Sequence, residues 1–274
     1  MMNTRQYCIL WVVLSVLAIS AGCAGQIQPV RFAVVADVQY ANKDAAGERY
    51  YRQSPGGLER FVQAANMQKP DFAIEFGDII DGGPDAAQEL DRILAIYHQL
   101  DCPKYYVLGN HEFSGLSRNV VLAKLNLEKG YYAFDRGTFR FVVLDTVELS
   151  ASSDAAIGQL AWLDRQLADA AMRKMDVMVF GHYPPLPEAG SYLAGNARAV
   201  CQRLEKYGCV RAYLCGHYHP GGYVKQNGVH YLTLPAMVDT PDGRTWAMMT
   251  LYPDRLDIQG TGKIKNQTLT FQTK

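Results

Sequence analysis

The chain has 274 residues, 49% of them hydrophobic, and its 27 lysine and arginine residues are balanced by 27 aspartate and glutamate residues. This balance argues against a nucleic-acid surface, which needs clustered positive charge, and favours small-molecule partners. The length is sufficient to bury the core of one α/β domain. We therefore expect a monomer with a single folded domain and no nucleic acid partner.

The beginning of the chain has the composition of an export signal. Arg5 gives a short positive region, residues 9–19 are almost wholly apolar, and residues 20–22 are the small residues of a cleavage site. The apolar run is shorter than the roughly 20 residues that a membrane-spanning helix needs, which disfavours that alternative. We predict three segments: a signal peptide over residues 1–22, a tether over residues 23–29 and a folded domain over residues 30–274.

The residue after the small segment is Cys23, and a cysteine directly after Ala-Gly resembles a bacterial lipobox. We expect lipid attachment at Cys23, which would make the protein an extracytoplasmic lipoprotein anchored to a bacterial membrane, in the periplasm or at the cell surface. Secretion after cleavage nearby is the alternative. An oxidising compartment would permit disulfides, with the pairing left open, among four cysteines: Cys102, Cys201, Cys209 and Cys215.

The first half of the mature chain alternates strands and helices. Runs of β-branched and aromatic residues predict strands at residues 30–36, 72–76 and 105–108. Helical spacing at residues 58–67 lies between the first two strands, so the domain opens with a βαβ unit. A second helix is predicted because Leu90, Ile93, Leu94 and Tyr97 fall on one helical face.

The second half contains more strands. Two hairpins are predicted, one joining residues 131–134 to 139–144 about Arg136-Gly137, the other joining residues 222–225 to 229–234 about Asn227-Gly228. The remaining elements are a helix through Leu160, Leu163 and Leu167, a strand at 177–180, a helix at 197–207, and strands at 210–214, 246–251 and 255–259. This order favours an α/β fold with two facing mixed β-sheets flanked by helices, a four-layer sandwich.

Five short blocks place carboxylate, amide or imidazole groups beside glycine or alanine. They are Ala36-Asp37-Val38-Gln39, Gly77-Asp78-Ile79-Ile80-Asp81, Gly109-Asn110-His111-Glu112, Gly181-His182 and Gly216-His217-Tyr218-His219. The first four follow runs of strand type, so the polar side chains should lie at strand ends. One such block is a weak signal, but five in order predict a metal-binding cage.

The second and third blocks offer distinct ligand types. The two oxygens of Asp78 can bridge two cations, which leaves Asp81 for another task. Asn110 and His111 present an amide oxygen and an imidazole side by side after a strand, although a turn capped by asparagine is the alternative. These groups are suitable for a hydrolytic site with two metal ions.

Histidine usage strengthens the prediction. Only six histidines occur, and four of them lie in the blocks. His217 and His219 are two residues apart, as are the polar residues of the first block, so each pair can reach one cavity from a strand terminus. His98 falls in a predicted helix and His230 in a predicted hairpin strand, and we expect both to be structural.

The ordered set resembles the calcineurin-like metallophosphoesterase superfamily, whose pattern is Asp-x-His, Gly-Asp-x-x-Asp, Gly-Asn-His-Glu, Gly-His and Gly-His-x-His. Gln39 replaces the first histidine here. The chain is similar to the manganese-dependent ADP-ribose/CDP-alcohol diphosphatase family in this glutamine, in Arg49-Tyr50-Tyr51-Arg52 and in the run from Gly216 to Tyr223. The likeness extends from Phe32 to Ile264, although some of those enzymes have aspartate where Tyr218 stands.

The resemblance implies two divalent metal ions. One would be held by Asp37, Gln39, Asp78 and His219, and the other by Asp78, Asn110, His182 and His217, with Asp78 as the bridge. The amide oxygen of Gln39 is a harder ligand than an imidazole nitrogen. We therefore favour Mn²⁺, with Mg²⁺, Fe²⁺ or Zn²⁺ as alternatives.

Two further residues are candidates for proton transfer. His111 is not needed for coordination and could protonate the leaving oxygen as a general acid. Asp81 is its candidate partner, because a nearby carboxylate favours the charged imidazolium and raises its pKa. A purely loop-capping role is the alternative for Asp81.

Candidate substrate contacts come from the segments that flank the blocks. Arg49 and Arg52 could grip the second phosphate through bidentate hydrogen bonds, with surface stacking as the alternative. Phe113 and Tyr40 could stack on a nucleobase, with packing in the core or at the rim as the alternative.

The resemblance implies an enzyme that cleaves the diphosphate bond of ADP-ribose, CDP-alcohols and related nucleoside diphosphate conjugates to a nucleoside monophosphate and a phosphorylated alcohol. Gln39 and the segment from Arg49 to Arg52 favour this function over a cyclic nucleotide phosphodiesterase or phosphomonoesterase of the same fold. A non-catalytic, metal-dependent ligand-binding lipoprotein is the alternative from another class. It is disfavoured because mere binding does not need Asp81 and His111.

Overall fold

The computed structural model describes residues 28–151, 153–190 and 195–272. The predicted signal peptide and Cys23, with most of the tether, lie outside the described residues. Among the helices within those ranges, none has the length and apolar character needed to cross a bilayer.

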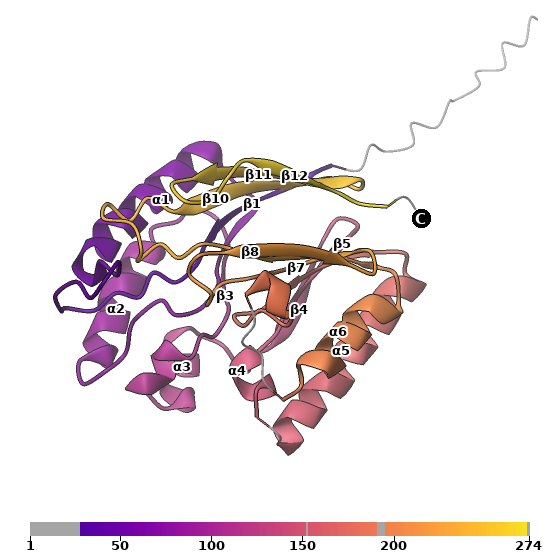
Figure 1. Cartoon of the computed structure of the whole chain (residues 1–274), viewed down its shortest axis with the longest axis horizontal. Coiled ribbons are helices and arrows are strands. Elements are labelled where there is room, and N and C mark those ends of the chain that lie inside the picture. The colour runs from indigo at the N-terminus through magenta and orange to yellow at the C-terminus, as the bar shows by residue number, and fades with distance from the viewer. Residues whose placement is uncertain (1–27, 152, 191–194, 273–274) are drawn as a thin grey trace, which may run out of the picture.

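Two six-stranded mixed sheets form the centre of the domain (Figure 1). In spatial order, the first contains β12 (Gln267–Thr270), β11 (Arg255–Thr261), β10 (Trp246–Leu251), β1 (Val30–Val35), β2 (Phe72–Glu75) and β3 (Lys104–Tyr106). The second contains β4 (Tyr132–Arg136), β5 (Phe139–Val143), β6 (Asp176–Phe180), β7 (Val210–Cys215), β9 (Val229–Thr233) and β8 (Gly222–Gln226). The predicted pair of facing mixed sheets is confirmed.

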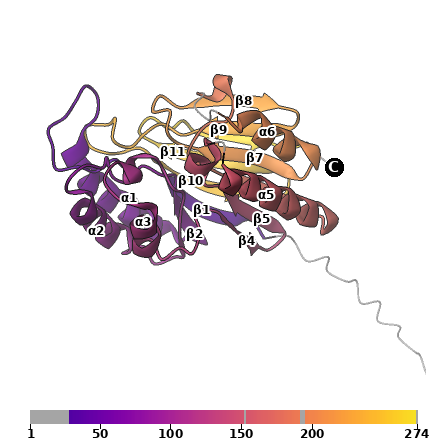
Figure 2. The same cartoon turned by 90° about the horizontal axis from the view of Figure 1, so that it is seen from below.

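Helices cover the outer faces of both sheets (Figures 1 and 2). Those beside the first sheet are α1 (Ser54–Gln68), α2 (Ala86–Tyr97) and the short α3 (Arg118–Lys124); those beside the second are α4 (Thr146–Leu149), α5 (Asp154–Met172) and α6 (Ala197–Lys206). Three 3₁₀ turns are η1 (Tyr51–Gln53), η2 (His111–Ser114) and η3 (Pro187–Ala189). The resulting order of helix, sheet, sheet and helix is the predicted four-layer sandwich.

An aromatic core holds the two sheets together. The rings of Phe32 and Phe72 on the first sheet stack with centroids 5.0 Å apart, and both rings contact Phe141 of the second sheet. Phe180, at the end of β6, lies 6.1 Å from Phe32. All four side chains are fully buried. Their packing fixes the spacing between the sheets, and therefore between the strand ends that carry the polar blocks.

The predicted chain connections are confirmed. β1 and β2 pair in parallel across α1, as a βαβ unit requires. Asn227 and Gly228 both have positive φ, at 48° and 85°, and turn β8 into β9. β10 returns to the first sheet and pairs antiparallel with β1, which explains why the strand-rich second half contributes to both sheets.

The described cysteines are in the thiol form, so the disulfides that the sequence permitted are not formed. Cys201 is within hydrogen-bond reach of the carbonyl of Pro185, and Cys209 of that of Leu167. The Cys215 thiol lies 3.2 Å from the hydroxyl of Thr233. Each buried sulfur thus has its own polar neighbour, and burial raises the pKa of the Cys201 thiol to about 11.

Candidate metal centre

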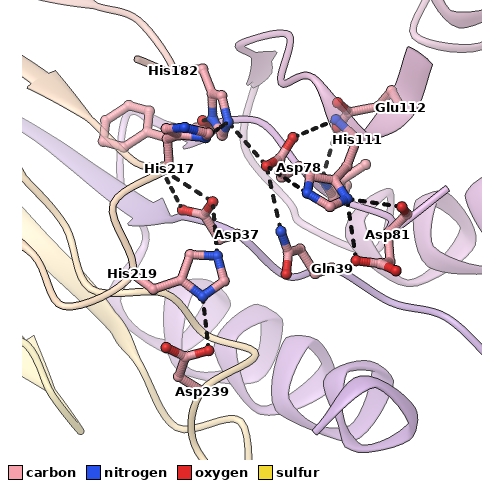
Figure 3. Close-up of polar contacts among 12 residues, drawn as sticks. Asp37, Gln39, Asp78, Asp81, His111, Glu112, His182, His217, His219 and Asp239 are labelled. Carbon is pink, nitrogen blue, oxygen red and sulfur yellow. Dashed lines mark hydrogen bonds and ion pairs between the residues drawn. The ribbon is translucent and has the colours of Figure 1, made fainter. Parts of the chain in front are cut away.

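Polar side chains from both sheets meet at the carboxyl ends of β1, β2, β6 and β7 (Figure 3). His182 Nε2 lies 3.0 Å from Asp78 Oδ2 and 3.2 Å from His217 Nδ1. These three residues each offer a ligand atom, and the three atoms lie within 4.8 Å of one another. The amide of Gln39 also reaches Asp78 Oδ2, at 3.4 Å. Four residues predicted to bind metal therefore converge on one buried point.

Asp37 forms the second part of the same cluster (Figure 3). Its carboxylate accepts from the backbone N–H of His217 at 3.0 and 3.1 Å, and His219 Nε2 lies 3.8 Å away. The other ring nitrogen of His219 lies 2.8 Å from Asp239 Oδ1. A carboxylate behind a metal-binding histidine fixes the orientation of its ring. Sequence reasoning did not identify Asp239, which belongs to none of the five blocks.

The backbone at the strand ends adopts a conformation that non-glycine residues rarely use. The φ angles of Asp37, Gln39, Asp78 and His217 are 52°, 40°, 56° and 68°. Left-handed geometry is unfavourable for such residues and often accompanies functional sites. It is held here by hydrogen bonds between the first two blocks, from Asp37 N to Gly77 O at 3.2 Å and from Gln39 N to Asp78 O at 2.8 Å.

Glycine allows the blocks to touch. A Cβ on Gly77 would lie 2.6 Å from Nδ1 of His182 and 2.7 Å from the backbone nitrogen of Gly109. A Cβ on Gly109 would overlap both the backbone nitrogen and the carboxylate of Asp78. Both glycines are therefore required for the second, third and fourth blocks to approach within contact distance.

His182 is held in one orientation and one tautomer. Its Nδ1 lies 2.7 Å from the carbonyl oxygen of Phe76, which can only accept, so Nδ1 carries a proton and Nε2 faces Asp78. The buried hydroxyl of Thr146 accepts from the backbone N–H groups of His182 and Tyr183 at 3.1 and 3.0 Å. Thr146 lies just after β5 and was not identified from the sequence.

The centre stabilises positive charge. Burial raises the pKa of Asp37 to about 6. Burial also opposes the charged form of His182, but the carboxylates of Asp78 and Asp37 outweigh it and raise the pKa of His182 to about 10. Burial, followed by the charge of His182, lowers the pKa of His217 to about 3. A cation between the two carboxylates is therefore favoured, and a second proton on the neighbouring imidazole is not.

Two amide oxygens show that the residues fit a metal. Gln39 Oε1 and Asn110 Oδ1 are buried and have no hydrogen-bond partner in the described parts of the chain. An unsatisfied buried acceptor costs about 1–3 kcal/mol. Divalent cations would satisfy both oxygens, and amide, carboxylate and imidazole donors are appropriate for ions such as Mn²⁺. The division of the predicted ligands between two ions remains a prediction.

His111 lies at the rim of the centre with Asp81 behind it (Figure 3). Its Nδ1 lies 2.9 Å from the backbone oxygen and 3.2 Å from the carboxylate of Asp81, while its Nε2 is 4.0 Å from Asp78 Oδ2. The hydrogen bond that Nδ1 donates to the carboxylate of Asp81 raises the pKa of His111 to about 9. The two residues predicted to pair are in contact. Asp81 also contacts Lys43, which sequence reasoning did not identify.

The two arginines predicted to grip phosphate occupy a loop beside the site. Arg52 is exposed, pairs with Asp44 and donates to the side chain of Asn42 at 3.1 Å. Arg49 is half-buried, and its backbone exchanges hydrogen bonds with that of Ala46. The side chain of Arg52 therefore contacts residues of its own loop. Phosphate binding by either arginine remains a prediction.

The aromatic candidates pack against neighbouring side chains. The ring of Tyr40 is 4% exposed in the core, and its hydroxyl accepts from Arg92 at 2.8 Å. This is the packing alternative to nucleobase stacking. Phe113 is half-buried, with the guanidinium of Arg118 4.7 Å from its ring centre.

The two histidines expected to be structural lie outside the centre. His98 Nε2 is 3.0 Å from the hydroxyl of Tyr106. His230 lies between the hydroxyl of Tyr223 and the backbone oxygen of Thr270, at 3.0 and 3.1 Å. Both rings therefore pair with structural neighbours in and beside the sheets.

The fold and the centre together define a metal-dependent phosphohydrolase, and comparison with known proteins gives the same class. The profile of the calcineurin-like phosphoesterase family matches residues 30–221. The crystal structure of a dimetal phosphatase from Danio rerio superposes with a TM-score of 0.81 at 26% identity, over 89% of this chain and 99% of that one.

Two plant proteins are similar over almost their whole length. A manganese-dependent ADP-ribose/CDP-alcohol diphosphatase from Oryza sativa is 31% identical over 88% of this chain and 94% of its own. The protein of the same name from Arabidopsis thaliana is 29% identical over 89% of this chain and 98% of its own. The chain therefore belongs to the calcineurin-like phosphoesterase family and, within it, to that of the manganese-dependent ADP-ribose/CDP-alcohol diphosphatases.

Replacing Asp78 by alanine should abolish metal binding and turnover together, because its carboxylate is the group that the predicted ligands share. Metal analysis of the purified variant and an activity assay would measure both. Asp91→Ala, which removes an exposed carboxylate paired with Lys124, serves as the control and should retain both properties. Near-normal turnover of Asp78→Ala would contradict the ligand assignment.

Thr146→Val should destabilise the fold by about 2 kcal/mol, because it leaves two buried backbone N–H groups without their acceptor. Urea denaturation would measure the change in the free energy of unfolding. Thr146→Ser keeps the hydroxyl and should therefore retain most of the stability that the valine variant loses. Equal stability of the valine variant and the wild type would show that the hydroxyl does not support the His182 segment.

Proposed function

We propose that this protein hydrolyses the diphosphate bond of ADP-ribose, CDP-alcohols and related nucleoside diphosphate conjugates, with a nucleoside monophosphate and a phosphorylated alcohol as products. The observation that carries the proposal is the position of His111, which Asp81 holds at the rim beside Asp78. The chain also aligns with 94% of the ADP-ribose/CDP-alcohol diphosphatase from rice. A group in this position can act on the leaving oxygen.

Seven residues of the chain would hold the two ions: Asp37, Gln39, Asp78, Asn110, His182, His217 and His219. When bound, divalent cations supply Lewis acid catalysis and activate water as a nucleophile. The carbonyl of Phe76 and the carboxylate of Asp239 would keep two of the imidazoles in ligand orientation.

His111 would supply the proton. Asp81 holds Nδ1, which directs Nε2 toward the cavity. This hydrogen bond raises the pKa of His111 to about 9 and so favours the charged ring that a general acid requires. The proton would pass from Nε2 to the oxygen that departs with the phosphorylated alcohol.

We further propose manganese as the native metal, since two of the predicted ligand atoms are hard amide oxygens. The names of the relatives from rice and Arabidopsis agree with this choice. Turnover of ADP-ribose, CDP-glycerol, a cyclic nucleotide and an aryl phosphate should be compared with Mn²⁺, Mg²⁺ and Zn²⁺. Faster hydrolysis of the cyclic nucleotide or the aryl phosphate than of both diphosphates would contradict the proposed substrate class.

We also propose that the enzyme is a monomeric lipoprotein of an extracytoplasmic compartment, with lipid attached at Cys23. The support is the positive, apolar and small-residue order of residues 1–22. The enzyme would then act on nucleotides outside the cytoplasm.

Cys23→Ser should abolish lipid attachment and release the protein from the membrane fraction, because the thiol is the acylation site. Mass spectrometry of the mature N-terminus would detect the modification. A wild-type N-terminus that is unmodified, or that begins elsewhere, would support simple secretion.

His111→Ala should keep both metals yet reduce the rate by about 10²- to 10⁴-fold, the usual scale of general acid catalysis. A phosphorylated alcohol is a better leaving group than a simple alkoxide and needs less protonation. An alkyl phosphodiester should therefore lose more rate than CDP-glycerol.

Metal analysis and steady-state kinetics on both substrates would check this prediction. Equal losses on the two substrates would indicate charge stabilisation instead of proton transfer. Unchanged rates with intact metal content would remove His111 from the mechanism.

A further inference from the structure

Lys43 is a cation beside the centre that none of the five blocks contains. It lies on the loop of residues 41–50, which leads from the first block to η1 and projects from the body of the domain (Figure 2). Its ammonium contacts the carboxylate of Asp81 and sits 4.1 Å from the ring centre of Tyr51, which is itself buried. Although the Lys43 side chain is 48% exposed, its charged end therefore has a defined place.

That place is on the side where the leaving group would depart. Asp81 Oδ1 is 3.2 Å from Nδ1 of His111, and the opposite nitrogen of His111 faces Asp78 at 4.0 Å. His111 thus stands between the shared metal ligand and the pair formed by Asp81 and Lys43. If His111 protonates the leaving oxygen, that oxygen lies at Nε2, and the phosphate attached to it could extend past the ring toward Lys43.

A phosphate there would meet the negative carboxylate of Asp81, so a nearby positive charge is needed. Arg52, one of the two arginines that the sequence offered for this task, is paired with Asp44 and Asn42. The ammonium of Lys43 has three N–H donors, so it can donate one to Asp81 and another to a phosphate oxygen. Binding would need no separation of the existing ion pair.

We propose that Lys43 binds the second phosphate of the substrate, the one that departs with the alcohol, and thereby selects diphosphates over esters that carry a single phosphate. This inference rests on the proposed diphosphatase function and makes Lys43 a specificity residue. It assigns to the loop of residues 41–50 a direct part in substrate recognition.

The test compares substrates that differ in the second phosphate. Lys43→Met should raise KM for CDP-glycerol about tenfold, the loss expected for one hydrogen bond to a charged group, with kcat nearly unchanged. The same variant should hydrolyse bis(4-nitrophenyl) phosphate with wild-type kinetics. Lys43→Arg should recover most of the KM. Lys129→Met, which removes an exposed lysine beside the ring of Tyr131, is the matched control and should leave the kinetics on both substrates unchanged.

A binding measurement tests the same inference without turnover. Calorimetry on the manganese-loaded protein should show that Lys43→Met weakens binding of α,β-methylene-ADP about tenfold. Binding of AMP, which lacks the second phosphate, should be unaffected. Equal weakening of both nucleotides would overturn the proposal.

Two kinetic outcomes would also overturn it. Unchanged kinetics on CDP-glycerol would remove Lys43 from substrate binding. An equal fall of kcat on both substrates would show that Lys43 positions Asp81 and His111 instead of holding a phosphate. Wild-type enzyme that cleaves the aryl diester but neither CDP-glycerol nor ADP-ribose would contradict the proposed function itself, and the calorimetric comparison would still decide the role of Lys43.

Discussion

The burial of two carboxylates in one cavity is the constraint on which the rest of the centre depends. Asp37 and Asp78 are 0% and 1% exposed, and charges so placed are costly unless they are compensated. Backbone N–H groups of His217 and His111 bond to them, and His182 lies against Asp78. Amide oxygens from the first and third blocks are nevertheless buried there without partners in the described chain. A cation satisfies carboxylates and amide oxygens together. The buried acceptors that are unfavourable without a metal therefore favour the binding of one.

Such a cavity requires a backbone that delivers acceptors from several strands to one point. An ordinary strand end would carry successive side chains apart, whereas the left-handed residues at the ends of β1, β2 and β7 turn them inward. The conformational cost is offset by hydrogen bonds between blocks and by the aromatic packing that fixes the separation of the two sheets. Glycine at positions 77 and 109 lets the blocks make contact. Rigidity at the strand ends therefore serves coordination, because ligands that are already oriented lose little freedom when a metal binds.

The sequence predicted those parts of the molecule whose signal is local. Asn227-Gly228 specifies its hairpin through backbone preference alone, and apolar periodicity located the long helices and buried strands. β12 was missed because it is a four-residue edge strand in which only Leu269 is buried, so almost no apolar pattern marks it. Lys43 and Asp239 were missed for a different reason: each reaches the centre from a loop, and its partner becomes visible only when distant segments are folded together. The pairing of Arg52 with Asp44 could not be predicted either, because it depends on the course of the loop that carries both residues.

In the proposed mechanism, histidine serves two tasks in one centre, as metal ligand and as acid. In His182, His219 and His111 alike, Nδ1 faces a protein oxygen and Nε2 points toward the carboxylates. Their side chains are 0%, 11% and 24% exposed, in that order. Where water is excluded and the partner is a neutral carbonyl, as for His182, the ring can present a lone pair to a metal. At the rim, where a substrate can enter, the same orientation would present a proton to it. In the proposed mechanism, depth in the centre would therefore separate ligand from acid, and His111 would act as the acid because the third block ends where the buried centre opens.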